Sequence, residues 1–320
     1  MFDLGFLLNP PTGLAIPVIL GLSFLLGLLH GGTPDEHTWP ITFSYSIGTY
    51  STRGGAKAGL IFSTGFTIQR AILTSLGFLG LAAVYEKYNL DGPVYVAVGV
   101  VMLLAGWYLL QGSDMHLPLD HVLERLLGPF LGDHGHHRSR VERRATPESG
   151  ARPIPLKMAM VHGFVAGWGV GGFAAILIFV LAPQMPNVGW AALVGVMFGL
   201  GTLVMQVLTG ALFALLARRR GLAPEQIQRL GHDTASRTLY WGGLTFAVAG
   251  LVITLIPWLN TYVLPTGNPI PNLNAIGYPT VLIIVVVGLI GGGTLYRNYH
   301  RLIQEPRRPE TESAPVESTP

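Results

Sequence analysis

The sequence predicts an all-α polytopic membrane protein with about seven transmembrane helices, arranged as a three-plus-three inverted repeat and one extra helix. Half of the 320 residues are hydrophobic and only 12% are charged, and the mean hydropathy is +0.47. A soluble domain carries about twice that charged fraction. The apolar residues form long continuous runs, and the basic residues gather in alternate connections between them.

Seven apolar runs approach the roughly 20 residues that an α-helix needs to cross the hydrocarbon core. They lie at about 14–31, 58–84, 93–111, 157–183, 188–217, 239–258 and 277–296. Strands of a membrane β-barrel would alternate apolar and polar residues within short segments. Residues 281–287 are instead continuously apolar, so we expect helices.

The basic residues predict how these helices are oriented. Of the 20 Lys and Arg residues, 18 lie in or beside the first, third and fifth connections and the C-terminal tail. The exceptions are Lys87, in the second connection, and Arg70, inside the second run. Cytoplasmic loops carry the excess of Lys and Arg. We therefore expect a multi-pass protein of the cytoplasmic membrane with its N-terminus outside and its C-terminus in the cytoplasm.

Three pairs of short segments recur in the same order in the two halves of the chain. The pairs are 27–31 with 160–163, 61–65 with 197–201, and the glycines at 99 and 106 with those at 243 and 250. An odd number of helices per repeat forces opposite orientations, as in many secondary transporters. The expected divisions are a first repeat (1–111), a His-rich cytoplasmic loop (112–156), a second repeat (157–258), an external loop with the seventh helix (259–303) and a disordered tail (304–320).

The segment 30–37 is the strongest candidate for a functional site. It places two imidazoles and two carboxylates within eight residues, at the end of an apolar run. Ionisable groups at membrane depth usually mark a substrate or ion path, and histidine with carboxylate oxygen is a ligand set for divalent transition metals. We expect His30, Asp35 and His37 to act as metal ligands.

Local sequence also predicts a broken helix at this segment. Gly31-Gly32 is a poor helix interior, and Pro34 pushes Thr33 out of the α region. Residues 33–36 read as a capping box with proline at the first helical position. We expect one helix to end near His30, an unwound Gly-Gly step, and a new helix after Thr33. Transporters place binding sites at such breaks.

Five other polar residues are assigned to this site from their positions in the sequence. We expect His162 to join the ligands from the other half of the repeat, although a lone histidine is also common in a protein core. Four residues are expected along the substrate path: Glu36, Gln69, Arg70 and Gln206. Glu36 could instead serve only the new helix's N-terminus, His37 could be an interfacial histidine, and Arg70 could form a structural pair or bind an anion.

The long connection at 112–156 is rich in histidine, and such tracts are typical of metal binding. Auxiliary metal capture is assigned to His116, His121, His134, His136 and His137. The alternative is a solvated loop whose histidines are incidental.

These motifs resemble the nickel/cobalt transporter family and its relatives, the urease-accessory-type and sulfite-exporter-like membrane proteins. His30 and Asp35 match the spacing of the family's first signature, with Glu36 where the family has histidine and His37 displaced by one. Residues 62–67 resemble the frame of the second signature but lack its histidine, and 162–164 resembles the start of the family's second half. The resemblance implies secondary transport of Ni²⁺, Co²⁺ or a related divalent ion.

The leading hypothesis is therefore a secondary transporter, not an enzyme, with the transition-metal ion as substrate and no tightly bound cofactor. The alternatives are an anion or small-solute exporter that uses Arg70, and a membrane metalloenzyme that activates water. The chain has no cysteine, which excludes thiolate ligands, and no Gly-Lys-Ser/Thr phosphate loop for ATP. The expected partners are the lipid bilayer and the ion, with no nucleic acid, and homo-oligomerisation is left open.

Overall fold

The computed structural model describes residues 4–49, 51–80, 84, 87, 88, 90–111, 156–218, 222 and 224–304. Within these ranges the regular structure is almost entirely helical. Four helical stretches are long and apolar enough to cross a membrane: 91–110, 188–215, 226–255 and 278–304. The predicted class, an all-helical protein with membrane-spanning segments, agrees with this architecture.

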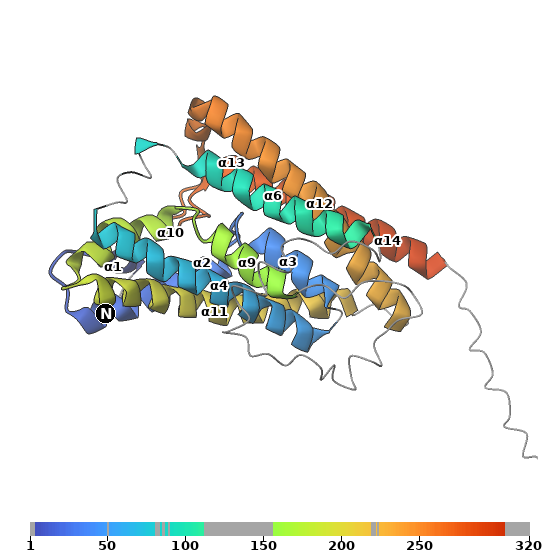
Figure 1. Ribbon diagram of the computed structural model, residues 1–320, viewed down its shortest axis with the longest axis horizontal. Coiled ribbons are helices and arrows are strands. Elements are labelled where there is room, and N and C mark those ends of the chain that lie inside the picture. Colours follow the sequence, from blue (N-terminus) through green and yellow to red (C-terminus); the bar gives the residue numbers. More distant parts are fainter. Residues whose placement is uncertain are drawn as a thin grey trace, which may run out of the picture.

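The helices form two layers (Figure 1). One layer contains α1 (Leu4–Leu8), α2 (Ile16–Gly32), α3 (Trp39–Gly48), α4 (Thr52–Phe78), α9 (Leu156–Ala166), α10 (Gly172–Ala175) and α11 (Val188–Arg218). After α10 the chain continues helically through wider turns at Ile176–Leu181 and a tight turn at Ala182–Gln184.

The second layer contains α6 (Asp91–Leu110), α12 (Pro224–Leu255), α13 (Tyr278–Ile283) and α14 (Gly293–Gln304). Wider turns at Ile284–Gly292 join α13 to α14. The connection from α12 to α13 holds a short 3₁₀ helix, Pro257–Thr261, and a two-stranded antiparallel ladder of β1 (Leu264–Pro265) and β2 (Ala275–Ile276).

Glycines allow the helices of the first layer to approach closely. A Cβ on Gly27 of α2 would lie 2.0 Å from the Phe198 carbonyl oxygen of α11, and one on Gly163 of α9 would lie 1.9 Å from the Phe62 carbonyl oxygen of α4. The absence of a Cβ at these glycines therefore lets the paired backbones approach closely, as small residues do between membrane helices. The resulting close packing fixes α2, α4, α9 and α11 around one buried region.

Alternate connections meet at the same end of the bundle. The ends where α3 leads to α4, where α11 leads to α12 and where α14 finishes lie together, on the right in Figure 1. Gly55 of α4 lies against the carbonyl oxygen of Gly210 of α11 at this end. The Gln226 amide donates to the Leu302 carbonyl oxygen at 2.9 Å. These connections therefore lie at one end of the bundle.

The predicted Gly-Gly break is wrong in its position. α2 continues through Gly31 and ends at Gly32, and the N–H of the capping residue Thr33 donates to the Leu29 carbonyl oxygen at 2.9 Å. Residues 33–38 are the non-helical step, and α3 begins at Trp39, so the capping box expected at 33–36 does not form. Packing explains the difference, because a Cβ on Gly31 would lie 2.8 Å from Met205 Cβ and 2.9 Å from the Thr202 carbonyl oxygen.

Three other helix boundaries also differ from the apolar runs. The second helix is 52–78 rather than 58–84, because Ser51 caps it with an Oγ that accepts from the Gly54 N–H at 2.9 Å. α12 starts at Pro224 rather than near 239 and so continues through a polar first half. The run at 157–183 is interrupted, since α9 ends at Ala166 and α10 begins at Gly172.

Candidate functional site

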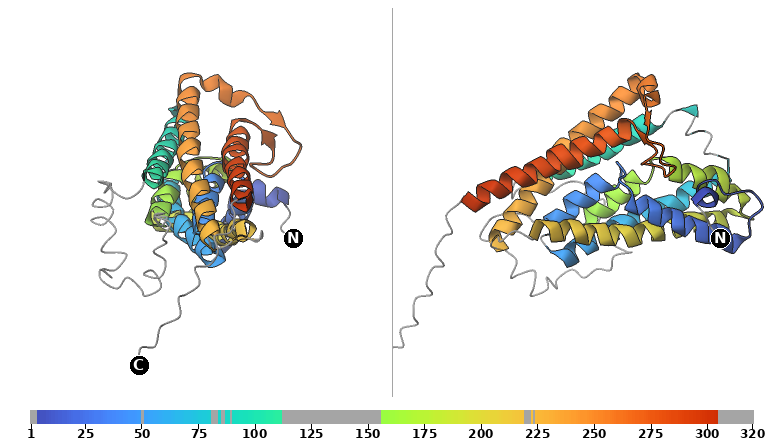
Figure 2. Two further views of the ribbon diagram at one scale, coloured as in Figure 1. Left: turned by 90° about the vertical axis from the view of Figure 1, so that its right-hand side faces the viewer. Right: turned by 180° about the vertical axis from the view of Figure 1, so that it is seen from behind.

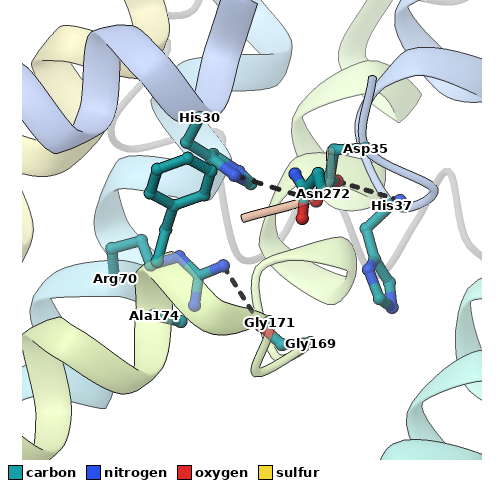
Figure 3. A pocket seen from close by; sticks show the side chains of 9 residues that line it. His30, Asp35, His37, Arg70, Gly169, Gly171, Ala174 and Asn272 are labelled. Carbon is teal, nitrogen blue, oxygen red and sulfur yellow. Dashed lines mark hydrogen bonds and ion pairs between the residues drawn. The ribbon is translucent and has the colours of Figure 1, made fainter. Parts of the chain in front are cut away.

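Two interrupted helices face one another across a small buried cavity. The first interruption, 33–38, separates α2 from α3, and the second, 167–171, separates α9 from α10. Both contribute to the cavity wall, together with Arg70 of α4 and Asn272 of the α12–α13 connection (Figure 3). The cavity measures about 10 Å³, which is close to the least volume that holds one water molecule.

Asp35 shapes the first interruption and faces the cavity. Its Oδ1 accepts hydrogen bonds from the backbone N–H groups of His37 and Thr38, both at 3.0 Å. An aspartate that bonds the backbone two or three residues on stabilises a turn. Its Oδ2 lies 3.7 Å from His30 Nδ1 and 3.4 Å from the Asn272 amide nitrogen. One oxygen is therefore structural and the other belongs to the site.

Glu36 and His37 form a second pair that rests on Tyr95 of α6. The Tyr95 hydroxyl donates to Glu36 Oε1 at 2.9 Å, and His37 Nδ1 lies 3.2 Å from the same oxygen. The His37 and Tyr95 rings stack at 4.8 Å with 21° between their planes. Glu36 thus orients His37 rather than only serving the start of α3. Ligand atoms of Asp35, Glu36 and His37 all lie within 4.8 Å of one another.

His30 is enclosed by three aromatic rings at the end of α2. Its ring stacks on Phe66 at 5.5 Å, and Phe198 and Phe173 lie at 5.2 and 5.7 Å. Among the described residues, neither His30 Nε2 nor His37 Nε2 has a hydrogen-bond partner, although both atoms are buried. A buried polar atom without a partner costs about 1–3 kcal/mol. These two nitrogens in the cavity wall are therefore available to a ligand, and the buried Nε2 of His162, beside the cavity, is likewise without a partner among the described residues.

Arg70 brings a positive charge to the same cavity. Its Nη2 donates to the Gly169 carbonyl oxygen of the second interruption at 3.1 Å. Its guanidinium also lies over the Phe66 ring at 4.5 Å and 5.6 Å from the Phe198 ring. A Cβ on Gly169 would lie 2.7 Å from His37 Nε2, so glycine leaves room for that imidazole. Arg70 and His37 therefore both pack against the second interruption at Gly169.

The three remaining predicted residues of the helical core lie beside the cavity rather than in its wall. His162 Nδ1 lies 2.9 Å from both the Tyr45 hydroxyl and the Met158 carbonyl oxygen. The Gln206 Oε1 accepts from the Thr42 hydroxyl at 2.6 Å and so ties α11 to α3. Gln69 is buried against Gly167, where a Cβ would lie 2.4 Å from Gln69 Oε1. The five histidines assigned to auxiliary capture, at 116–137, lie outside the described residues.

Sequence reasoning missed two residues of this site, Tyr95 and Asn272. Tyr95 lies in the apolar run of α6 and carries no distinctive local pattern. Asn272 follows Pro271, and a Pro-Asn pair is typical of the centre of a type II turn. That signal predicts the turn but not its contact with a helix break far away in the sequence.

Comparisons with protein-family models, with curated proteins and with solved structures found no match to this chain. The chemistry of the cavity is therefore the basis for assigning a function.

Proposed function

We propose that this protein is a secondary transporter that moves a divalent transition-metal cation, Ni²⁺-like or Co²⁺-like, across the cytoplasmic membrane. The observation that carries the proposal is the orientation of His37. Its Nδ1 lies 3.2 Å from Glu36 while its buried Nε2 has no hydrogen-bond partner among the described residues. Metal-binding histidines typically donate one ring N–H to a carboxylate and bind the metal through the other nitrogen.

The neighbouring groups supply further ligands for such an ion. Asp35 Oδ2 and His30 belong to the same wall, and imidazole with carboxylate suits divalent first-row metals. The small cavity also favours this substrate. A dehydrated ion occupies about the space of one water molecule, whereas a sulfite or an organic solute requires the site to open.

The architecture supports transport by alternating access. In the proposed seven-helix arrangement, α2 with α3 and α9 with α10 are the first spans of the two inverted repeats. Secondary transporters place substrate sites where discontinuous helices of two repeats meet. The ion would exchange its water for imidazole and carboxylate, and rocking of the repeats would then expose it to the other side. The His-rich connection would capture ions on the cytoplasmic side.

Metal titration of the purified protein tests the proposal. We expect the wild type to bind Ni²⁺ or Co²⁺, and His37→Ala and His30→Ala to lose most of that affinity in isothermal titration calorimetry. The matched control is His162→Ala, which removes a buried histidine outside the cavity wall and should keep the wild-type dissociation constant. Equal metal affinity in the wild type and His37→Ala would contradict the proposal.

A second candidate, an anion exporter of the same architecture, is favoured by Arg70 and by the start of α10. The cavity wall includes Gly171, Phe173 and Ala174. The first N–H groups of a helix lack intrahelical partners and carry partial positive charge.

The substitution Arg70→Gln distinguishes the cation transporter from the anion exporter. A cation site should bind Ni²⁺ as tightly or more tightly after the positive charge is removed, whereas an anion site should lose its affinity for sulfite.

A further inference from the structure

The connection between α12 and α13 contains a turn that reaches the cavity. In this turn, residues 270–273, the Leu273 N–H donates to the Ile270 carbonyl oxygen at 3.0 Å and Asn272 has a φ of 68°. These features, with Pro271 before Asn272, match a type II turn, whose third position requires a positive φ and favours glycine or asparagine. Glycine would satisfy the backbone at least as well. What asparagine adds is its side-chain amide.

That amide contacts the first helix interruption. The Asn272 Nδ2 lies 3.3 Å from Thr33 Oγ1 and 3.4 Å from Asp35 Oδ2. The preceding residue packs against the start of α10, directly after the second interruption, because a Cβ on Gly172 would lie 3.0 Å from Pro271 Cβ. Figure 2 shows the connection descending from the ends of α12 and α13 to α10, and Figure 3 shows Asn272 beside Asp35. A single turn therefore touches both interrupted helices.

Asn272 contacts Asp35 at Oδ2, the carboxylate oxygen that a bound cation would need. Asp35 lines the cavity, and its Oδ1 already accepts two backbone N–H groups, which leaves Oδ2 as the oxygen without a backbone hydrogen bond. Oδ2 receives the Asn272 amide N–H₂, which donates hydrogen bonds and cannot bind a cation. A cation that binds Asp35 Oδ2 must therefore compete with this amide.

We infer that Asn272 is a positioning residue of the binding site, a latch that holds Asp35 when no ion is bound and that the ion displaces. Displacement frees the turn 270–273 from the first interruption and opens the α12–α13 connection over the cavity. The identity of the displacing ion rests on the proposed function, whereas the closure of the cavity by Asn272 does not.

The first test measures competition for Asp35. Asn272→Gly keeps the positive φ without strain and removes only the amide, and Asn274→Gly makes the same substitution at an exposed position of the same connection. Losing a competing hydrogen bond should tighten Ni²⁺ binding by roughly three- to tenfold for Asn272→Gly and leave Asn274→Gly at the wild-type value. An unchanged dissociation constant would overturn the latch. Weaker binding would also overturn it and would make Asn272 an ion ligand through Oδ1.

The second test needs no ion. The chain has no native cysteine, so Ala174→Cys places one thiol in the cavity wall. We expect Asn272→Gly to raise the rate at which a polar methanethiosulfonate reagent labels that thiol severalfold, and Asn274→Gly to leave it unchanged. Equal rates in all three backgrounds would overturn the latch. A wild type that binds no metal but shows the rate difference would contradict the proposed function while supporting the latch.

Discussion

At the residue scale, the contacts of Glu36 explain how a carboxylate can be held in this interior. An ionised side chain at membrane depth is costly unless it pairs with another group. Glu36 Oε1 faces both the Tyr95 hydroxyl and His37 Nδ1. The carboxylate therefore connects an aromatic residue of the second layer to an imidazole in the cavity wall. Tyr95 thus contacts the same carboxylate oxygen that faces Nδ1 of His37.

Replacement of Tyr95 with phenylalanine should weaken metal binding without removing a ligand. The change keeps the ring that stacks on His37 and deletes the hydroxyl that orients Glu36. Loss of such an outer partner typically lowers metal affinity by about 10- to 100-fold. Calorimetric titration with Ni²⁺ would measure the effect.

The matched control is Tyr45→Phe. It removes a buried tyrosine hydroxyl that contacts His162 rather than Glu36. We expect the Tyr45→Phe protein to retain the wild-type affinity. If Tyr45→Phe lowered the metal affinity as much as Tyr95→Phe, His162 would have to be counted among the metal ligands, as the sequence predicts.

The sequence predicts the local part of this site well and its distant part poorly. His30, Asp35 and His37 lie within one short segment, and all three line the cavity with Arg70. Their convergence follows from a helix break that Pro34 signals locally. Tyr95 and Asn272 lie 59 and 237 residues from their carboxylate partners. Which helix supplies such a contact depends on tertiary packing, which a local pattern does not contain.

At the element scale, the glycines of α2 show why the sequence predicts the helix break at the wrong residues. Gly31-Gly32 has low helix propensity, at roughly 1 kcal/mol per glycine relative to alanine. Packing against α11 outweighs this cost, because only glycine lets the two backbones approach where Gly31 meets Thr202. Sequence alone does not distinguish a glycine that breaks a helix from one that packs it. The interruption instead falls at Pro34, whose ring restricts the preceding residue.

Gly27→Ala should destabilise the protein by about 1–3 kcal/mol, the usual cost of overpacking a tight contact. The added methyl group would lie 2.0 Å from the Phe198 carbonyl oxygen, so α2 and α11 must separate. Phe198 also contacts the His30 ring, so metal affinity should fall together with stability. Thermal unfolding of the purified protein in detergent would measure the stability change.

Gly21→Ala provides the control on the same helix. Apart from the surrounding backbone of α2, no atom lies within 4 Å of the position that a Cβ on Gly21 would take, and alanine is the better helix former. We expect unchanged or slightly raised stability. Equal destabilisation by Gly21→Ala and Gly27→Ala would show that helix propensity, rather than the contact with α11, controls the effect.

At the scale of the whole molecule, the cavity lies where the two layers meet. The first layer supplies both interrupted helices, and the second supplies Tyr95 from α6 and Asn272 from the connection after α12. Movement of one layer against the other would therefore change the contacts of Glu36 and Asp35 together. In the proposed transport cycle, a rocking motion would therefore act directly on these two carboxylates.

The distribution of basic residues predicts how this molecule sits in the membrane. The end of the bundle that contains the start of α4 carries the connections rich in Lys and Arg, and such connections remain in the cytoplasm. Single cysteines at two exposed positions test this orientation in the cysteine-free chain: Arg53→Cys in the first turn of α4, and Pro186→Cys just before α11 at the opposite end. An impermeant maleimide added to intact cells should label Pro186→Cys and leave Arg53→Cys unlabelled until the cells are permeabilised. The reverse pattern would place the α12–α13 connection, and with it the Asn272 turn, on the cytoplasmic side.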